Sequence, residues 1–282
     1  ADISDDDQME SLNTVDDIDQ TWHFASTLKY LPKDMEEIYQ TNIRGTKNLI
    51  GLHKRVSKKT SRFFYISTSY AAGRDISYIP EARIEMNEDM SFHNEYERSK
   101  LRAENLVLDQ ISKGIIRGNI FRPSVVIGDK KEGLLINYHG FYHSINTLFN
   151  FKKSLEKNNE SLTELFFETD PNYTVNLIPI EDAIGLMYSI AEAGPKNGTV
   201  FNVVNRSEIK VKDILKVIGK AIDVKLTICK TGSDTSITKT KNWYDKLMDY
   251  GGNYFMPYLD HRIKYDTSNS LKILKKEYNF DL

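Results

Sequence analysis

The segment RFFYIST at residues 62–68 decides the fold class, because it is rich in aromatic and β-branched residues and hardly alternates between polar and apolar positions. Such a run is typical of a strand that is covered on both faces, as in a parallel sheet. Three other segments have the same character: TWHFAS at 21–26, IIRGNIFRPSVVIG at 115–128 and TVNLIPI at 174–180. The sequence therefore predicts four buried strands.

Helical patterns lie between these strands. One runs over about 34–54 and places Met35, Ile38, Ile43, Leu49 and Ile50 on one face. A second runs over about 94–112, and a third covers 181–192 and ends at Gly194-Pro195, a common stop signal. Strands that alternate with helices predict an α/β fold, a doubly wound parallel sheet with helices on both faces.

Composition excludes several classes of protein. The chain is 40% hydrophobic and 28% charged with a net charge of −2, which gives no reason to expect nucleic acid or an acidic membrane surface as a partner. The single cysteine, Cys229, excludes an intrachain disulfide and suits a reducing compartment. No apolar run approaches the roughly 18 residues of a membrane span, and the acidic start is no signal peptide. We expect a cytoplasmic protein.

The chain divides into two predicted units. Residues 1–128 and 174–205 carry the strands and form the predicted dinucleotide-binding domain. Residues 129–173 and 206–282 are more polar and aromatic and form a predicted smaller substrate lobe. We expect the lobe to cover the C-terminal edge of the sheet, where ligands bind in open α/β folds.

A Gly-rich turn that would hold the phosphates of a dinucleotide is not in this sequence, which contains neither GxGxxG nor GxxGxxG. Either the protein binds no dinucleotide, or the sequence lacks its first one or two βα units. The start favours the second explanation, because Ala1-Asp2-Ile3 resembles the exit of a strand.

Tyr96 and Lys100, in the segment NEYERSK at 94–100, are a candidate catalytic pair. Chance would give roughly two Tyr-to-cation pairs at this spacing, since the chain has 16 Tyr and 38 Lys or Arg, so the spacing alone decides nothing. The spacing does put both side chains on one helix face. A carbonyl oxygen that becomes an alkoxide needs a proton donor, and a nearby ammonium should lower the pKa of a tyrosine that supplies the proton.

Six motifs in order give the pair its context: HFAS at 23–26, NIRGT at 42–46, YISTSYAAG at 65–73, YERSK at 96–100, FRPSVVIGD at 121–129 and NLIPIEDA at 176–183. With these motifs the chain resembles the extended short-chain dehydrogenase/reductase family, and most closely its thioester reductase and fatty acyl reductase branch. The resemblance implies a Rossmann-like fold and a catalytic set of Tyr96, Lys100 and Thr68, with Ser69 as second choice for the last. It also implies that the missing segment carries the Gly-rich loop.

The same resemblance implies a nicotinamide cofactor, with NADP(H) favoured over NAD(H) from the branch alone. It assigns cofactor contacts to Asp2, Ile3, Phe24, Ala25, Ser26, Asn42, Ile66, Ser67, Tyr96, Lys100, Arg122, Pro123, Ser124 and Val126. Several of these positions have a plain structural alternative as strand ends. For Asn42 we favour a brace between backbone segments over a catalytic role.

Three functions follow as hypotheses. The first is reduction of an acyl thioester, bound to coenzyme A or a carrier protein, or of the derived aldehyde. The second is a nucleotide-sugar epimerase or dehydratase, in which Lys210, Lys212 and Arg262 could hold a diphosphate or could equally be surface charges. The third is a non-catalytic family member that senses cofactor. The family habit would be a homodimer through the helices at 42–54 and 96–112.

Two other patterns carry less weight. His139 and His143 have a spacing that can bind zinc, but no HExxH glutamate and no third ligand are evident, so we expect no metal. The aromatic cluster at 243–261 could cover an apolar substrate or could be a packing patch of the lobe.

Overall fold

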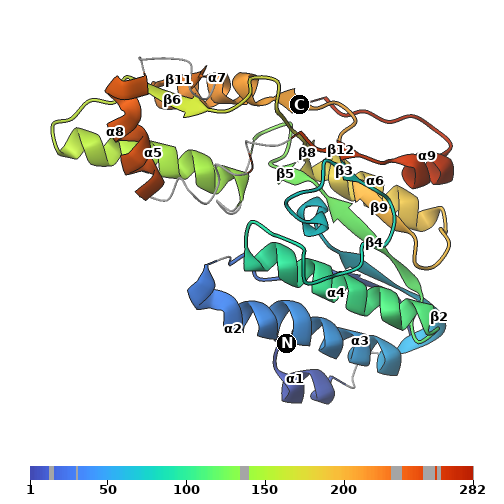
Figure 1. Ribbon diagram of the computed structural model, residues 1–282. Coiled ribbons are helices and arrows are strands. Elements are labelled where there is room, and N and C mark those ends of the chain that lie inside the picture. Colours follow the sequence, from blue (N-terminus) through green and yellow to red (C-terminus); the bar gives the residue numbers. More distant parts are fainter. Residues whose placement is uncertain are drawn as a thin grey trace.

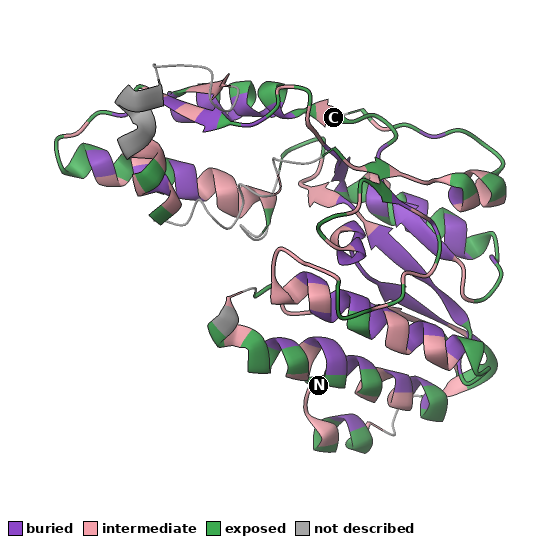
Figure 2. Cartoon of the chain, viewed as in Figure 1, coloured by how far each residue is buried: buried purple, intermediate pink, exposed green. Residues whose placement is uncertain are grey.

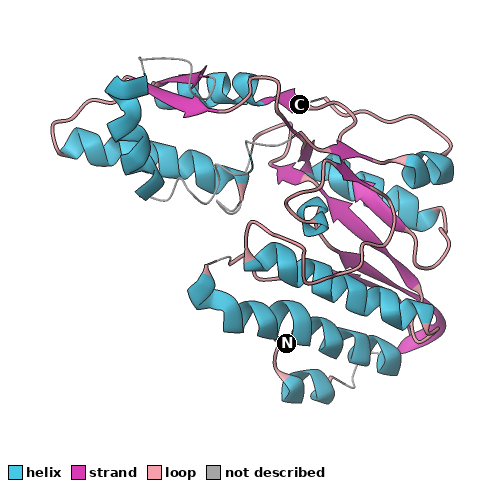
Figure 3. Cartoon of the chain, in the orientation of Figure 1, coloured by secondary structure: helices cyan, strands magenta, loops and turns pink. Residues whose placement is uncertain are grey.

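The computed structural model describes residues 1–12, 16–29, 31–133, 140–229, 237–249, 258 and 262–281. Its centre is a parallel sheet in the order β1-β2-β4-β9 (Figure 3). The strands are β1 (Ile18–His23), β2 (Ser57–Ile66), β4 (Gly118–Pro123) and β9 (Val200–Val203). Helices connect these strands, so the predicted parallel α/β fold is confirmed.

Successive side chains of β2 pack into two separate hydrophobic cores, because side chains alternate between the faces of a strand. Phe63 and Tyr65 pack with α3 (Gly45–Val56) and α4 (Glu95–Ser112). Phe64 and Ile66 pack on the other face with α6 (Ile180–Glu192) and α9 (Ser268–Leu274). Figure 1 shows α3 and α4 lying together along the sheet, and Figure 2 shows the strands between the two helical layers as buried. Full burial of one such aromatic side chain contributes about 2–3 kcal/mol.

Two of the predicted helices match closely, and one does not. The predicted 94–112 corresponds to α4, which is capped by Asn94, whose side chain accepts a hydrogen bond from Glu97 N. The predicted 181–192 corresponds to α6. The predicted 34–54 is interrupted: it consists of α2 (Met35–Ile38), a wide π-type turn η2 (Tyr39–Arg44) and α3, preceded by the short turn η1 (Pro32–Asp34). The π-type turn holds Asn42 in the interior, 2% exposed.

Two predicted strands are also divided. Segment 115–128 becomes β4 and β5 (Val125–Ile127), and segment 174–180 becomes β7 (Thr174–Val175) and β8 (Leu177–Pro179). β5 leaves the main sheet and pairs with β8, while β7 pairs with β10 (Ile209–Lys210). A further short pair joins β3 (Tyr78–Ile79) to β12 (Lys264–Tyr265). These small strand pairs lie at the C-terminal edge of the sheet. The apolar runs in the sequence carry no sign of the points where the strands divide.

A second group of elements has its own core. It contains α5 (Phe141–Lys157), α7 (Val211–Ile222), α8 (Ile237–Asp249) and the parallel strands β6 (Glu164–Glu168) and β11 (Lys225–Cys229). In Figure 1 this group stands apart from α3 and α4. Trp243 and Tyr244 of the aromatic cluster pack against this core. The exact domain boundaries stay a prediction.

The N-terminus lies against the helical layer. α1 (Asp6–Ser11) contacts α3, and Ile3 packs so closely on Gly45 that a Cβ there would lie 2.7 Å from the isoleucine side chain. Among the described residues, no helix is both long enough and apolar enough to cross a membrane.

Candidate active site

Tyr96 and Lys100 lie one turn apart on α4, at the C-terminal edge of the sheet. Lys100 is 2% exposed, and its Nζ donates to the Ile66 carbonyl at the end of β2, at 2.6 Å. The same Nζ lies 4.5 Å from the centre of the Tyr65 ring. The Tyr96 hydroxyl hydrogen-bonds Ser26, in the loop after β1. The pair is thus tied to the ends of two neighbouring strands.

Burial dominates the electrostatics of this pair. It raises the pKa of Tyr96 to about 12, with Glu97 adding to the rise and the Ser26 hydrogen bond opposing it. Burial also lowers the pKa of Lys100 to about 7, against the attraction of Glu104. The sequence-based expectation of a lowered tyrosine pKa is therefore wrong. Burial of the phenol sets the direction, and Lys100 is not among the groups that shift the Tyr96 pKa.

Thr68 lies two residues beyond the end of β2. Its Oγ1 accepts from Tyr70 N at 3.3 Å and caps the short turn η3 (Ser69–Ala72), which packs against α4. Ser69 is fully buried, and its hydroxyl has no hydrogen-bond partner among the described residues. The choice of Thr68 over Ser69 as the hydroxyl that holds the substrate oxygen stays a prediction.

The predicted cofactor positions after β1 and β2 form one rim. Phe24 is 54% exposed and stacks on Trp22 at 6.2 Å, and Ala25 beside it is exposed. At the end of β2, Ser67 is 4% exposed and its hydroxyl has no hydrogen-bond partner within the described part of the chain. A buried hydroxyl without a partner beside Lys100 fits the polar ribose end of a nicotinamide cofactor. The sequence supplies no Gly-rich turn for the phosphates.

Asn42 is a brace. Its Oδ1 accepts from Thr27 N at 2.9 Å, and its Nδ2 donates to Ser99 Oγ at 2.9 Å. It thereby holds the loop after β1 against the helix that carries Tyr96. This is the structural role that the sequence favoured for Asn42.

The side chains of the FRPS stretch serve the interior instead. Arg122 is fully buried and pairs with Glu104 at 2.5 Å, and it also donates to the carbonyls of Pro80 and Ala82. Ser124 Oγ donates to Asn176 Oδ1 at 2.7 Å. A cofactor contact through the Arg122 guanidinium would break this buried pair, so contacts in the stretch would have to come from the backbone, from Pro123 or from Val126 of β5.

Ile3, which follows Asp2, packs against Gly45 at the start of α3. Asp2 is exposed, and hydrogen bonds from Ser4 lower the pKa of its carboxyl. Asn48 Nδ2 donates to the Ile3 carbonyl at 2.9 Å, which fixes this end of the chain. The adenine contact that the resemblance implies for Asp2 and Ile3 stays a prediction.

The zinc pattern is only partly visible. His143 lies in the first turn of α5, and His139 is outside the described residues. No cluster of His, Cys, Asp and Glu that could hold a metal ion occurs in the part of the chain that the structure describes.

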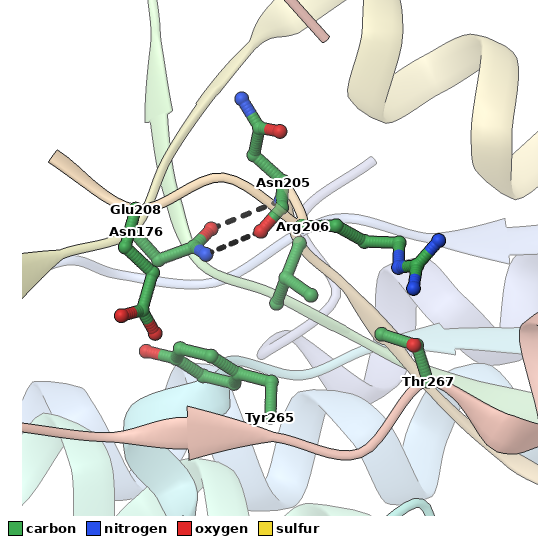
Figure 4. Close-up of a pocket in the computed structure, with 7 residues that line it drawn as sticks. Asn176, Asn205, Arg206, Glu208, Tyr265 and Thr267 are labelled. Atoms are coloured by element: carbon green, nitrogen blue, oxygen red, sulfur yellow. Dashed lines mark hydrogen bonds between the residues drawn. The ribbon is translucent and has the colours of Figure 1, made fainter. Parts of the chain in front are cut away.

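A polar cavity of about 180 Å³ opens near the exit of β9 (Figure 4). It is lined by Asn176, Val204, Asn205, Arg206, Glu208, Tyr265 and Thr267. Two hydrogen bonds join Asn176 to the Asn205 backbone, and Figure 4 shows the Tyr265 hydroxyl pointing toward Glu208. Sequence reasoning missed the cavity, since its lining comes from three separate segments.

Comparison with known proteins gives the family of the chain. A model of an NAD-binding family described as "Male sterility protein" matches residues 3–181. The chain belongs to this family. The match confirms the resemblance to the extended short-chain dehydrogenases/reductases that the order of the motifs predicted. No match was found among curated protein sequences.

Solved structures share the fold. The terminal R domain from the myxalamid PKS-NRPS biosynthetic pathway is 16% identical with a TM-score of 0.70, over 98% of this chain and 68% of that one. UDP-glucuronic acid 4-epimerase from Bacillus cereus, solved with NAD, is 18% identical with a TM-score of 0.62, over 100% and 71%. RMD from Pseudomonas aeruginosa, solved with NADPH, is 19% identical with a TM-score of 0.55, over 92% and 87%. At these identities the likeness concerns the fold alone.

Proposed function

We propose that the chain is an NAD(P)H-dependent oxidoreductase that reduces an acyl thioester, or the aldehyde derived from it. One observation carries the proposal: Tyr96 and Lys100 share a helix face where the ends of β1 and β2 meet, bonded to Ser26 and Ile66. Family membership supports a nicotinamide cofactor. The acyl substrate rests on the motif resemblance to the thioester reductase branch.

The residues divide the chemistry among them. When bound, the cofactor would supply a hydride to the carbonyl carbon of the substrate. The Thr68 hydroxyl would hold the carbonyl oxygen, and Tyr96 would give it a proton as negative charge develops. Because a buried phenolate is costly, Tyr96 needs a positive charge beside it at that moment. Lys100, with a pKa of about 7, can carry a proton of its own near neutral pH and so supply that positive charge. The resulting hemithioacetal would collapse to an aldehyde as its C–S bond breaks, with the hydroxyl proton lost and the thiol of coenzyme A or of the carrier protein released.

Ser67 and Lys100 would hold the ribose next to the nicotinamide, and Phe24, Ala25 and Ser26 would line its approach. NADP(H) remains our preference over NAD(H), on the branch resemblance alone. A homodimer through α3 and α4 also remains a proposal.

A nucleotide-sugar epimerase is the second candidate, and the polar cavity beside Tyr265 favours it. Apart from Val204, the residues that line the cavity are polar or aromatic with a hydroxyl, which suits a sugar better than an acyl chain. Lys210 and Lys212 are exposed and could contact a diphosphate. Such an enzyme would use Tyr96 and Lys100 in the same roles.

The test is NADPH oxidation by the natural full-length protein with acyl-coenzyme A and acyl-carrier-protein substrates of several chain lengths. Tyr96→Phe should lower kcat by roughly 10²–10⁴-fold, the usual worth of a positioned proton donor. Tyr78→Phe, at a tyrosine that is 53% exposed, is the matched control and should have no effect. No turnover on any acyl substrate would refute thioester reduction. Copurifying NAD with interconversion of a nucleotide sugar would establish the second candidate.

A further inference from the structure

Glu97 follows Tyr96 in the sequence, yet its carboxylate is 1% exposed and must be satisfied by the protein. Its Oε1 accepts from the Tyr258 hydroxyl at 2.6 Å. Its Oε2 accepts from the backbone N–H of His93 at 3.0 Å and lies 3.1 Å from His93 Nδ1. The first turn of α4 is therefore anchored by a tyrosine 161 residues further along the chain.

The hydroxyl of Tyr258 both donates and accepts a hydrogen bond. While it donates to Glu97, it accepts from Asn94 Nδ2 at 2.7 Å. Asn94 is the residue that caps α4 through its side-chain oxygen. One phenol group thus fixes the cap and the first turn of the helix that carries Tyr96.

The ring of Tyr258 reaches the other catalytic element. It meets the ring of Tyr70 edge-to-face, with centroids 5.0 Å apart at 90°, and it lies 4.7 Å from the ring of His93. Tyr70 belongs to η3, and its backbone N–H donates to Thr68 Oγ1. Tyr258 therefore fills the space between the turn that begins at Thr68 and the helix end that carries Tyr96.

We propose that Tyr258 is a positioning residue that clamps η3 to the first turn of α4, so that Thr68 and Tyr96 face the same substrate oxygen. This inference rests on the proposed function, because that function gives the two hydroxyls a common target. The clamp comes from the C-terminal part of the chain, so it also joins the C-terminal region to the catalytic helix. A displacement of about 1 Å between reacting groups can lower a rate by about 10²-fold, so such a clamp matters for turnover more than for binding.

The first experiment is Tyr258→Phe in the natural full-length protein. Phenylalanine keeps the ring against Tyr70 but removes both hydrogen bonds. We expect kcat to fall by about 10-fold or more with the KM for NADPH changed less than 2-fold, and with the fold retained by circular dichroism. Tyr188→Phe, at a tyrosine that is 57% exposed, is the control and should change neither parameter.

A double-mutant cycle separates positioning from general packing. If the Tyr258–Glu97 hydrogen bond is the route, Glu97→Met, which removes the acceptor, combined with Tyr258→Phe should cost no more in kcat than the worse single variant. Additive losses would overturn the clamp. If Tyr258→Phe fails to fold, Asn94→Ser keeps a helix cap while removing the donor to the tyrosine, and should show the same selective loss of kcat.

Amide hydrogen exchange tests the clamp without any turnover. Tyr258→Phe should raise exchange at residues 95–98 and 69–72 together, while the rest of α4 stays protected. Unchanged exchange at both segments would overturn the inference even in an active enzyme. If the natural protein reduces no substrate while the joint rise in exchange is observed, the proposed function fails and the clamp stands as a structural link.

Discussion

Replacing Lys100 with methionine should remove a pH dependence from the stability of the folded protein. Lys100 is 2% exposed, and burial lowers its pKa from 10.5 to about 7. Methionine keeps an unbranched apolar side chain and carries no charge. The Lys100→Met variant therefore isolates the cost of the buried ammonium.

The size of that cost follows from the pKa. A decrease from 10.5 to about 7 disfavours the ammonium by about 5 kcal/mol, at about 1.4 kcal/mol per pH unit. Between these two pH values the unfolded chain keeps a proton on Lys100 that the folded chain has released. The free energy of unfolding of the natural protein should therefore rise with pH in this window, by about 1.4 kcal/mol per pH unit, and this contribution should be absent from Lys100→Met.

Urea unfolding at about pH 7.5 and about pH 9 measures the effect. The difference in unfolding free energy between the natural protein and Lys100→Met should change by about 2 kcal/mol across this range. The contributions of other buried groups, such as Tyr96, cancel in that difference. Lys113→Met, at an exposed lysine that ends the same helix, should leave the pH dependence as it is. Parallel pH curves for the natural protein and Lys100→Met would refute the reasoning, since they would mean that Lys100 stays charged when buried.

Three further outcomes are expected. Asn42→Ala should lower the free energy of unfolding by about 1–3 kcal/mol in urea titrations, because it leaves the partly buried backbone N–H of Thr27 without its acceptor. Burial raises the pKa of Glu81 to about 7, so its contribution to the free energy of unfolding should fall by about 3 kcal/mol as pH rises from about 4.5 to 7. The Glu81→Gln variant should lack this fall. The same pH dependence of stability in the natural protein and in Glu81→Gln would contradict the burial argument. Gly118→Ala should abolish soluble folded protein, because the new Cβ would lie 1.7 Å from the Phe63 carbonyl oxygen. In the control Gly114→Ala the new Cβ meets nothing within 4 Å, and the free energy of unfolding should fall by only about 1–2 kcal/mol. Comparable yields of soluble protein from the two variants would count against the packing described.

Local sequence was sufficient for the elements whose pattern is strong. The apolar run around Phe63 predicts a strand covered on both faces, because β-branched and aromatic residues without alternation fit nowhere else. The helical pattern over 94–112 predicts the helix that carries Tyr96. The spacing of Tyr96 and Lys100 is likewise a property of the helix itself.

Local patterns failed where a distant segment supplies the partner. The break between β4 and β5 depends on pairing with β8, some 50 residues later, and an apolar run carries no mark of that exchange. The guanidinium of Arg122 turns inward because Glu104 of α4 is there to receive it. The direction of the Tyr96 pKa was mispredicted for the same reason, since burial acts through all surrounding atoms while sequence shows only the neighbour one turn away.

The sequence by itself determined the parallel α/β fold, the helix that bears the candidate pair and the family to which the chain belongs. These follow from side-chain periodicity, from capping and from the order of short motifs, all of which are local along the chain. Only the tertiary structure decided that Lys100 bonds the Ile66 carbonyl, that Asn42 bonds Ser99, and that Tyr258 holds the first turn of α4. Each of these is a contact between segments far apart in sequence, formed because buried polar groups must find partners wherever the fold brings them.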